Sequence, residues 1–273
     1  MAYKHWTLDE LPWDKFDRAK VDPDQEKIVR AAAMVEFNAP DYVVYLQNVF
    51  EEDQDFCRAA AQWGTEEVQH GEALSRWAML VDPGFDFQRR FVRFREGYKL
   101  DLETDTSIRG TRPAELVARC MVEVGTSSYY TALGDATGEP LLRAICRKIA
   151  SDEFRHYKLF YDHLKRYLST DRMNKLQRIR VALTRIAETE DDELSYAYYA
   201  ANVDEGPYDR ETFNNQYMRR AYSYYRHNHI DRVTAMVFKA CGLKPHTTLF
   251  NATRAGAWWL MQRKQKRLLR IAA

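Results

Sequence analysis

The sequence predicts an all-α protein built around a four-helix bundle, and three observations lead to this fold class. Helix-forming residues dominate the 273 positions, whereas glycine (11) and proline (8) are scarce. The alternation of apolar and polar residues that marks β-strands is missing, and apolar residues recur instead at helical spacing over long segments. Two of these segments carry the same short motif, Glu-x-x-His, which is typical of metal ligands on the helices of a bundle.

The composition limits the class of function. The 41 basic residues nearly balance the 40 acidic ones, so no basic field points to nucleic acid as a partner. The first residues lack the apolar core of a signal peptide, and no apolar run reaches the roughly 18 residues that a membrane span requires. We therefore expect a cytoplasmic protein.

The predicted bundle occupies residues 22–171 and follows an N-terminal arm, residues 1–21, that is rich in aromatic and charged side chains. Apolar residues at helical spacing predict its long helices, which we place at residues 23–52, 53–81, 113–136 and 140–168. Pro23 and Pro113 open two of them, since proline fits the first turn of a helix. An amphipathic segment at 85–102, followed by a polar stretch, separates the second helix from the third and predicts a crossover.

Two carboxylates fall where the predicted helices are otherwise apolar. Glu36 lies in the segment Ala31–Phe37 of the first helix, and Glu123 lies in Ala118–Thr126 of the third. A buried carboxylate is costly unless it is paired or bound to a metal. We therefore interpret both as candidate metal ligands; for Glu36, a partly exposed position at the edge of a helix is the alternative.

The second and fourth helices each carry Glu-x-x-His, as Glu67 with His70 and Glu153 with His156. Residues three apart in a helix share a face, so each pair presents a carboxylate and an imidazole in the same direction. One such motif is a weak signal, because a lone histidine on a helix is usually a surface or satisfied core residue. Two of them, with one glutamate from each remaining helix, make the ligand set of a di-iron or di-manganese bundle.

The spacing of these candidates along the chain supports a single site. The set is Glu36, Glu67, His70, Glu123, Glu153 and His156. The successive glutamates are separated by 31, 56 and 30 residues. Short, long, short is the order that two helix hairpins joined by a crossover should give. We therefore expect a ferritin-like four-helix bundle with a crossover, additional C-terminal helices and a buried two-metal site.

These residues also resemble those of the acyl-carrier-protein desaturases, which are soluble ferritin-like di-iron enzymes that insert a double bond into acyl chains. The stretch EEVQHG at 66–71 is similar to their EENRHG motif, and IASDEFRH at 149–156 is similar to their IAADEKRH. Glu36, Pro40 and Tyr42 match their E-x-x-x-P-x-Y pattern. The resemblance covers residues 6–165.

The resemblance implies the contents of the site. Two iron ions are expected, and manganese, which shares this ligand set, stays open as the alternative. By the same resemblance, Glu67 and Glu123 bridge the two ions, whereas Glu36 and Glu153 bind mainly one ion each. Thr126, which sits where the family keeps a threonine beside the metals, is expected to relay a proton.

Each histidine ring needs a second partner, because a metal-bound imidazole usually donates its other N–H to an acceptor. Asp152 is the candidate partner of His70 across the bundle, and Trp6 or Trp13 would extend that path to the surface for electrons. The electrons are expected from a separate reductase or ferredoxin, since the sequence contains no flavin, nicotinamide or iron–sulfur motif.

Residues 172–273 are predicted to form a helical extension packed on the bundle. Its expected helices are 175–188, 192–201, 210–227, 231–242 and 247–273. The last helix joins Trp258 and Trp259 to several lysines and arginines without any acid. Such a helix contacts a membrane surface or an acidic carrier protein, or is simply a solvated end favoured by the helix dipole.

The sequence therefore predicts a dioxygen-dependent oxidoreductase, and three readings stay open. The first is a di-iron desaturase or oxidase of a fatty acyl chain, or of another small hydrophobic substrate, with acyl carrier protein as the expected carrier. The second is another di-iron oxygenase, of the N-oxygenating or aldehyde-deformylating type. The third is a metal-binding, ligand-binding or peroxide-scavenging bundle. A long apolar tunnel beside the metals favours the first reading. A homodimer is expected by resemblance only.

Overall fold

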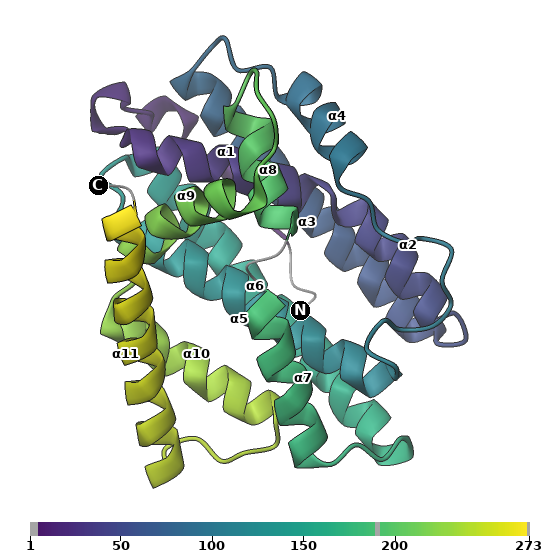
Figure 1. Ribbon diagram of the computed structural model, residues 1–273. Coiled ribbons are helices and arrows are strands. Elements are labelled where there is room, and N and C mark those ends of the chain that lie inside the picture. Colours follow the sequence, from purple (N-terminus) through teal and green to yellow (C-terminus); the bar gives the residue numbers. More distant parts are fainter. Residues whose placement is uncertain (1–4, 189–191, 272–273) are drawn as a thin grey trace.

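The computed structural model describes residues 5–188 and 192–271, and within these ranges the chain is helical and contains no β-strand (Figure 1). The prediction of an all-α fold is confirmed. The arrangement of the helices is consistent with the expected ferritin-like bundle. Within the same ranges, none of the helices combines the length and the apolar character needed to cross a membrane.

Four helices carry the candidate metal ligands: α1 (Pro23–Phe37), α3 (Gln54–Val81), α5 (Arg112–Ala136) and α6 (Pro140–Thr170). A side chain caps the start of each helix by accepting hydrogen bonds from backbone N–H groups of the first turn; the caps are Asp22, Asp53, Thr111 and Glu139. These caps satisfy amides that have no partner within the helix. The predicted boundaries of α3, α5 and α6 agree with the structure to within two residues.

The first predicted helix, residues 23–52, is wrong as a single element. The chain forms α1 and then α2 (Ala39–Val49), with a break at Asn38. Pro40 has no N–H to bond to the carbonyl of Glu36, so α1 cannot continue through it, whereas proline fits the first turn of the new helix α2. Glu36 therefore lies in the last turn of α1, next to the break.

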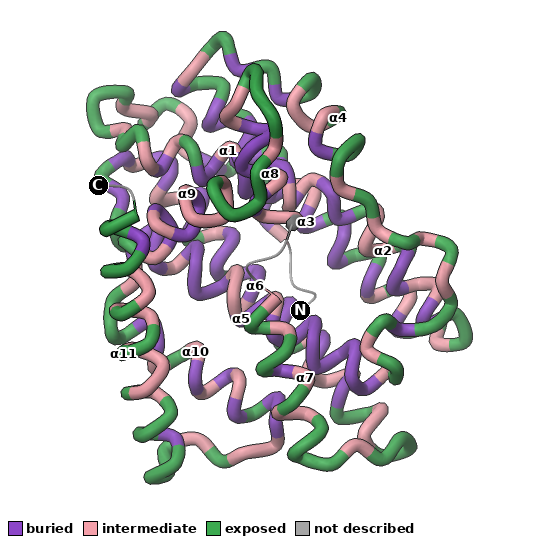
Figure 2. Tube along the Cα trace, viewed as in Figure 1, coloured by how far each residue is buried: buried purple, intermediate pink, exposed green. Residues whose placement is uncertain are grey.

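The ligand helices pack in two pairs that meet in the core. α1 packs on α3, α5 packs on α6, and α3 also contacts α6. The crossover between the pairs contains α4 (Phe87–Gly97), which is shorter than the predicted segment 85–102. Figure 2 shows that buried residues are concentrated along these ligand helices. The N-terminal arm joins this core, because Trp6 and Leu11 belong to the same apolar cluster as Trp77 of α3.

The C-terminal helices are α7 (Lys175–Ala187), α8 (Asp192–Asn202), α9 (Arg210–Ser223), α10 (His227–Ala240) and α11 (Thr248–Ile271). α8 and α9 contact α1, whereas α7 and α10 contact α5, and α11 contacts α9 and α10. The predicted boundary between α9 and α10 is wrong, since His227 begins α10 instead of ending α9. Residues 272–273, the end of the last predicted helix, lie outside the described residues. The division of the chain at residues 21 and 171 stays a prediction.

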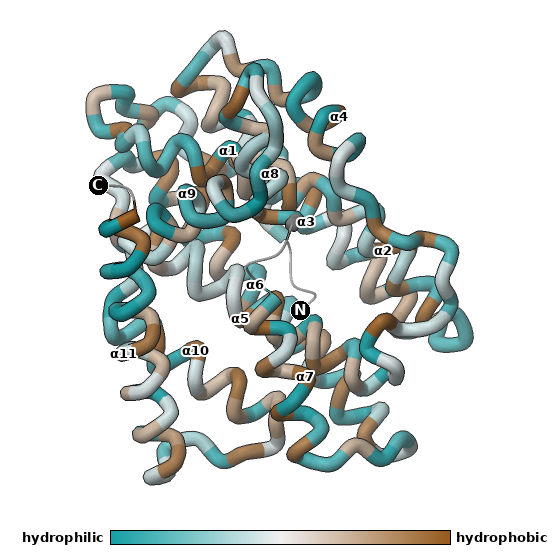
Figure 3. The backbone as a smooth tube through the Cα atoms, in the orientation of Figure 1, coloured by the Kyte–Doolittle hydropathy of each residue, from teal (hydrophilic) through white to brown (hydrophobic). Residues whose placement is uncertain are grey.

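Hydrophobic and hydrophilic residues are interspersed along most helices, as the colouring of the backbone in Figure 3 shows. α11 lies at the edge of the molecule in this view, with many exposed positions (Figures 1 and 2).

Candidate metal centre

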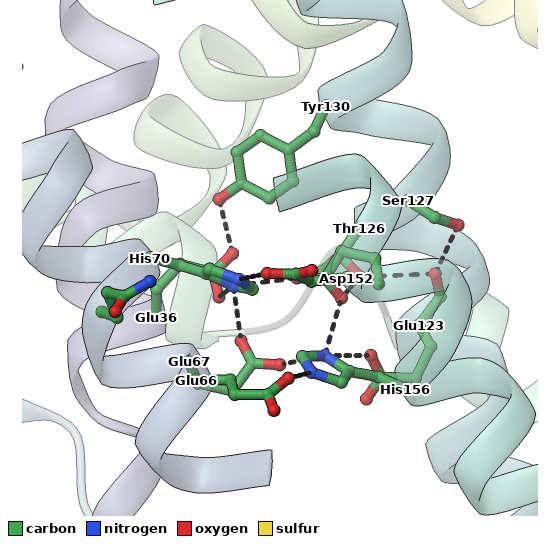
Figure 4. Close-up of polar contacts among 12 residues, drawn as sticks. Glu36, Glu66, Glu67, His70, Glu123, Thr126, Ser127, Tyr130, Asp152 and His156 are labelled. Carbon is green, nitrogen blue, oxygen red and sulfur yellow. Dashed lines mark hydrogen bonds and ion pairs between the residues drawn. The ribbon is translucent and has the colours of Figure 1, made fainter. Parts of the chain in front are cut away.

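The six ligand candidates predicted from the sequence come together in the interior of the bundle (Figure 4). They are Glu36 of α1, Glu67 and His70 of α3, Glu123 of α5, and Glu153 and His156 of α6. All six are buried, with at most 6% of any one residue exposed. Four separate helices thus bring four carboxylates and two imidazoles to one place.

The atoms that these residues offer fall into two overlapping groups. Within each group the atoms lie within 4.8 Å of one another; the groups are Glu36, Glu67, His70 and Glu153, and Glu67, Glu123, Glu153 and His156. Glu67 and Glu153 belong to both groups, whereas Glu123 belongs to one. Glu67 and Glu153 are thus the carboxylates common to both groups, whereas the assignment of Glu67 and Glu123 as shared ligands, which rests on the family resemblance, stays a prediction.

Each histidine points its Nδ1 atom toward the carboxylates. His70 Nδ1 lies 3.3 Å from Glu153 Oε1, and His156 Nδ1 lies 2.8 Å from Glu67 Oε1. Both Nδ1 atoms are buried and make no hydrogen bond. An imidazole nitrogen that is surrounded by carboxylates and free of hydrogen bonds suits a metal ligand.

The Nε2 atoms contact acids of the opposite motif. Asp152 Oδ2 lies 3.0 Å from His70 Nε2, which is the contact predicted from the sequence. Glu66 Oε2 lies 2.9 Å from His156 Nε2. Each motif thus supplies the acid that holds the proton on Nε2 of the other, which leaves the Nδ1 lone pair available. Glu66 was missed, although both motifs have an acid directly before their ligand glutamate.

One arginine connects these two acids. Arg155 donates hydrogen bonds to Asp152 Oδ1 at 2.5 Å and to Glu66 Oε2 at 3.0 Å. Burial opposes the ionisation of Asp152, but the hydrogen bonds with His70 and Arg155 outweigh burial and lower its pKa. Burial is likewise outweighed at Glu66, chiefly by the hydrogen bond with His156, and its pKa falls to about 2. Both acids therefore act as ionised acceptors at neutral pH.

The N-terminal arm extends this network toward the surface. Trp6 donates from Nε1 to Asp152 Oδ2 over 2.6 Å, and His5 Nε2 lies 2.7 Å from the same oxygen. Of the two tryptophans predicted for this path, Trp6 makes the contact. Trp13 does not, because it donates its Nε1 hydrogen to the carbonyl of Leu8.

Two hydroxyl groups of α5 contact carboxylates of the candidate set. Thr126 donates from Oγ1 to Glu153 Oε2 over 2.6 Å. Tyr130 donates a short hydrogen bond to Glu36 Oε1 (Figure 4). Burial, together with the charge of Glu36, raises the pKa of Tyr130 well above its ordinary value, so it stays a donor at neutral pH. Tyr130 was missed; its position seven residues after Glu123, on the same face of the helix, was the available signal.

The clustering of buried acids makes it harder for each of them to ionise. Burial, and after it the charges of neighbouring carboxylates, raise the pKa of Glu36 and of Glu123 well above the ordinary value. Burial disfavours the protonated forms of His70 and His156, yet the acids that surround the two rings outweigh burial and raise the pKa of both. Divalent cations would reverse this balance, because they stabilise ionised carboxylates and neutral imidazoles.

The unpartnered atoms of the cluster test whether metal ions fit. Buried atoms that make no hydrogen bond include Oε1 of Glu67, both carboxylate oxygens of Glu123, Oε1 of Glu153, and Nδ1 of His70 and His156. Buried polar atoms are rarely left without a partner, since desolvation costs free energy that a bond must offset. Carboxylate oxygens and imidazole nitrogens together are a donor set for divalent iron or manganese. The residues present therefore fit two such ions.

Comparison with known proteins identifies the family to which the chain belongs. The family model described as "Fatty acid desaturase" matches residues 17–189, which is more than half of the chain and includes all four ligand helices. The chain belongs to the fatty acid desaturase family. No curated protein matches the chain.

Membership of this desaturase family makes the chain an oxidoreductase by relationship. Desaturases typically depend on metal ions, and the buried carboxylates and imidazoles could hold them. The matched range ends close to the end of α7, so α8 to α11 lie outside it.

A cavity of about 400 Å³ adjoins the candidate metal centre of this desaturase-family protein. Glu36, Thr126 and Tyr130 line one part of it. Most of the wall is apolar or aromatic and includes Ala32, Val35, Val122, Leu194, Met218 and Ala221. A volume of this size is typical of small-molecule sites. Part of the wall comes from α8 and α9, which lie beyond the matched range.

Proposed function

We propose that this chain is a di-iron desaturase or oxidase that uses dioxygen to oxidise a fatty acyl chain. The observation that carries the proposal is the position of the cavity, because Glu36, one of the six candidate ligands, and Thr126 line a space whose wall is mostly apolar and aromatic. An acyl chain is the kind of substrate that such walls bind and shield from water. A polar pocket would have favoured the other oxygenase reactions, and a closed core would have favoured a binding protein.

In this proposal two iron ions are held by Glu36, Glu67, His70, Glu123, Glu153 and His156. Glu67 and Glu153 would be available to both ions, since both belong to the two groups of converging atoms. Bound iron would supply the activation of dioxygen, which no side chain provides. Manganese binds through the same ligand types, so the metal content has to be measured.

The chain's own residues then have three tasks. The cavity wall binds and orients the acyl chain and excludes water from the reacting part. Thr126 holds a proton on Oγ1 between Glu153 and the cavity, where it can be passed to or from a reacting group. Asp152 and Glu66 fix the tautomers of the two histidines.

The overall reaction defines what partners must supply. Removal of two hydrogens from the acyl chain, with reduction of one dioxygen to two waters, needs two further electrons and two protons. We propose a separate reductase or ferredoxin as the electron donor, because the sequence has no flavin, nicotinamide or iron–sulfur motif. Acyl carrier protein is the proposed carrier of the chain.

The metal assignment is tested by counting iron in the purified protein after anaerobic loading. We expect two iron ions per chain, and we expect Glu67→Ala to lose most of this iron, since Glu67 contributes to both groups. The matched control is Glu72→Ala, an exposed glutamate on the same helix, which should leave the iron count unchanged. An unchanged count in Glu67→Ala would refute the ligand set.

The substrate class is tested separately on the iron-loaded, reduced protein. Acyl chains on acyl carrier protein are supplied with dioxygen, and the products are analysed by mass spectrometry. Desaturation gives a product lighter by two hydrogens. A hydroxylated product would narrow the proposal to an oxidase, whereas turnover of amines or aldehydes alone would replace it with another di-iron reaction.

A further inference from the structure

The last helix, α11, carries several positive charges and no negative ones. Between Thr248 and Ile271 the sequence contains no aspartate or glutamate. Its cations are Arg254, Arg263, Lys264, Lys266, Arg267 and Arg270. Arg263, Lys266, Arg267 and Arg270 are exposed. The molecule as a whole is nearly neutral, so this helix concentrates a charge that the rest of the chain does not share.

The two faces of α11 differ in what they contact. Phe250 and Leu268 are buried, and they are 18 residues apart, which is five helical turns and therefore the same face. Trp259 lies halfway between them, two and a half turns from each, and so on the opposite face. Trp259 is 57% exposed and its neighbour Leu260 is 59% exposed. The packed face holds α11 to α9 and α10, whereas the other face presents large apolar side chains to solvent.

The exposed apolar side chains stand among the exposed cations. Arg263 lies one turn after Trp259 and places its guanidinium 5.3 Å from the centroid of the Trp259 ring. Leu269 and Ile271 flank Arg270, and about half of each side chain is exposed as well. Arginine next to tryptophan and leucine is the composition of helices that lie in the boundary between headgroups and acyl chains.

We propose that the exposed face of α11 docks on an anionic lipid bilayer. The positive charges match the negative surface potential of such a membrane, and the side chains of Trp259 and Leu260 enter the boundary of the hydrocarbon. An acidic protein would also match the charges. It would not explain why large apolar side chains stand exposed among the cations, since carboxylates gain nothing from them.

The same helix touches the wall of the cavity. The ammonium group of Lys264 lies 5.6 Å from the centroid of the Tyr222 ring, and Tyr222 lines the cavity beside the candidate metal centre. Because Tyr222 belongs to α9, on the packed side of α11, the helix would stand between the docked lipid surface and this wall of the cavity. The docking proposal itself does not depend on the reaction.

The experiment is co-sedimentation of the intact chain with vesicles of phosphatidylcholine, with and without phosphatidylglycerol. We expect binding to the anionic vesicles only, and weakening of it as salt is raised. The triple variant Arg263→Gln, Arg267→Gln, Arg270→Gln should lose binding by about fivefold for each cation removed. Brominated lipid should quench the tryptophan fluorescence of the wild-type protein more than that of Trp259→Phe, since Trp259 would lie at the boundary between headgroups and acyl chains.

The matched control removes the same number of positive charges outside α11, at three exposed positions, by Arg172→Gln, Lys175→Gln and Arg180→Gln. Its binding should equal that of the wild type, and both triple variants should keep the wild-type melting temperature because all six positions are exposed. Failure to bind anionic vesicles at low salt overturns the proposal, and so does equal weakening by both triple variants. Binding of acyl carrier protein through the three α11 arginines, without vesicle binding, would also overturn it.

Discussion

Two of the ligand helices, α3 and α5, each carry a glycine beside their ligands, and the two glycines lie in opposite surroundings. Gly71 follows His70 on α3, and a Cβ atom there would lie 2.7 Å from the backbone nitrogen of Phe37 in α1 and 2.9 Å from its Cα. Gly125 precedes Thr126 on α5, and a Cβ atom there would have no atom within 4 Å. One glycine is needed for a close approach of two backbones, and the other borders open space.

The difference shows that the candidate metal centre has a closed side and an open side. On the closed side, the contact at Gly71 holds the end of α1, with Glu36, against the turn of α3 that carries His70. On the open side, Gly125 and Thr126 line the cavity. The α1–α3 contact therefore positions ligands, whereas α5 faces the space that a substrate would occupy.

The largest effect is expected on the closed side, from Gly71→Ala. The new methyl group meets backbone atoms that cannot move aside, so we expect the free energy of unfolding to fall by about 1–3 kcal/mol. Iron loading should weaken as well, because Glu36 and His70 are displaced relative to each other. Denaturant unfolding and iron counts measure the two effects. Gly256→Ala in α11, where a Cβ meets nothing within 4 Å, is the control that should not destabilise; equal stability of the two variants would contradict a closed side.

The sequence predicts the candidate metal ligands better than it predicts which side of the metal centre is closed and which is open. The six ligand candidates could be found because helical spacing, motif repetition and the buried setting of Glu36 and Glu123 are all visible along the chain. Gly71 and Gly125 look alike in sequence. What a Cβ would meet at each depends on the helix packed across from it, and helix packing is a long-range property.

The same reason explains the other misses. Tyr130 reaches Glu36 from a different helix, and Glu66 reaches His156 across the bundle, so neither contact follows from local periodicity. The cavity wall was also out of reach, because it needs α8 and α9 to fold back onto the bundle. The break at Asn38 follows from Pro40, although the amphipathic pattern continues across it.

The next effect concerns the acids behind the two histidines, which lie away from the cavity. Asp152→Asn removes the ionised acceptor of His70 Nε2, and we expect the affinity for iron to fall about 10–100-fold. Glu66→Gln should weaken binding to a similar extent, since it removes the acceptor of His156 Nε2. Metal titration with a competing chelator measures both, with exposed Glu72→Gln as the control. If both variants bound iron with wild-type affinity, Asp152 and Glu66 would not support the two histidine ligands.

The smallest change in stability, and one of opposite sign, is expected on the open side. Gly125→Ala should raise the free energy of unfolding by about 0.5–1 kcal/mol, because alanine favours a helix interior over glycine and its methyl group meets no atom. Gly125→Leu should keep the iron count but fill part of the cavity, so long acyl chains should be lost as ligands before short ones. Thermal unfolding, iron counts and binding of acyl chains of graded length separate these outcomes. If Gly125→Ala destabilised as much as Gly71→Ala, both sides of the metal centre would be packed and a substrate would have to enter elsewhere.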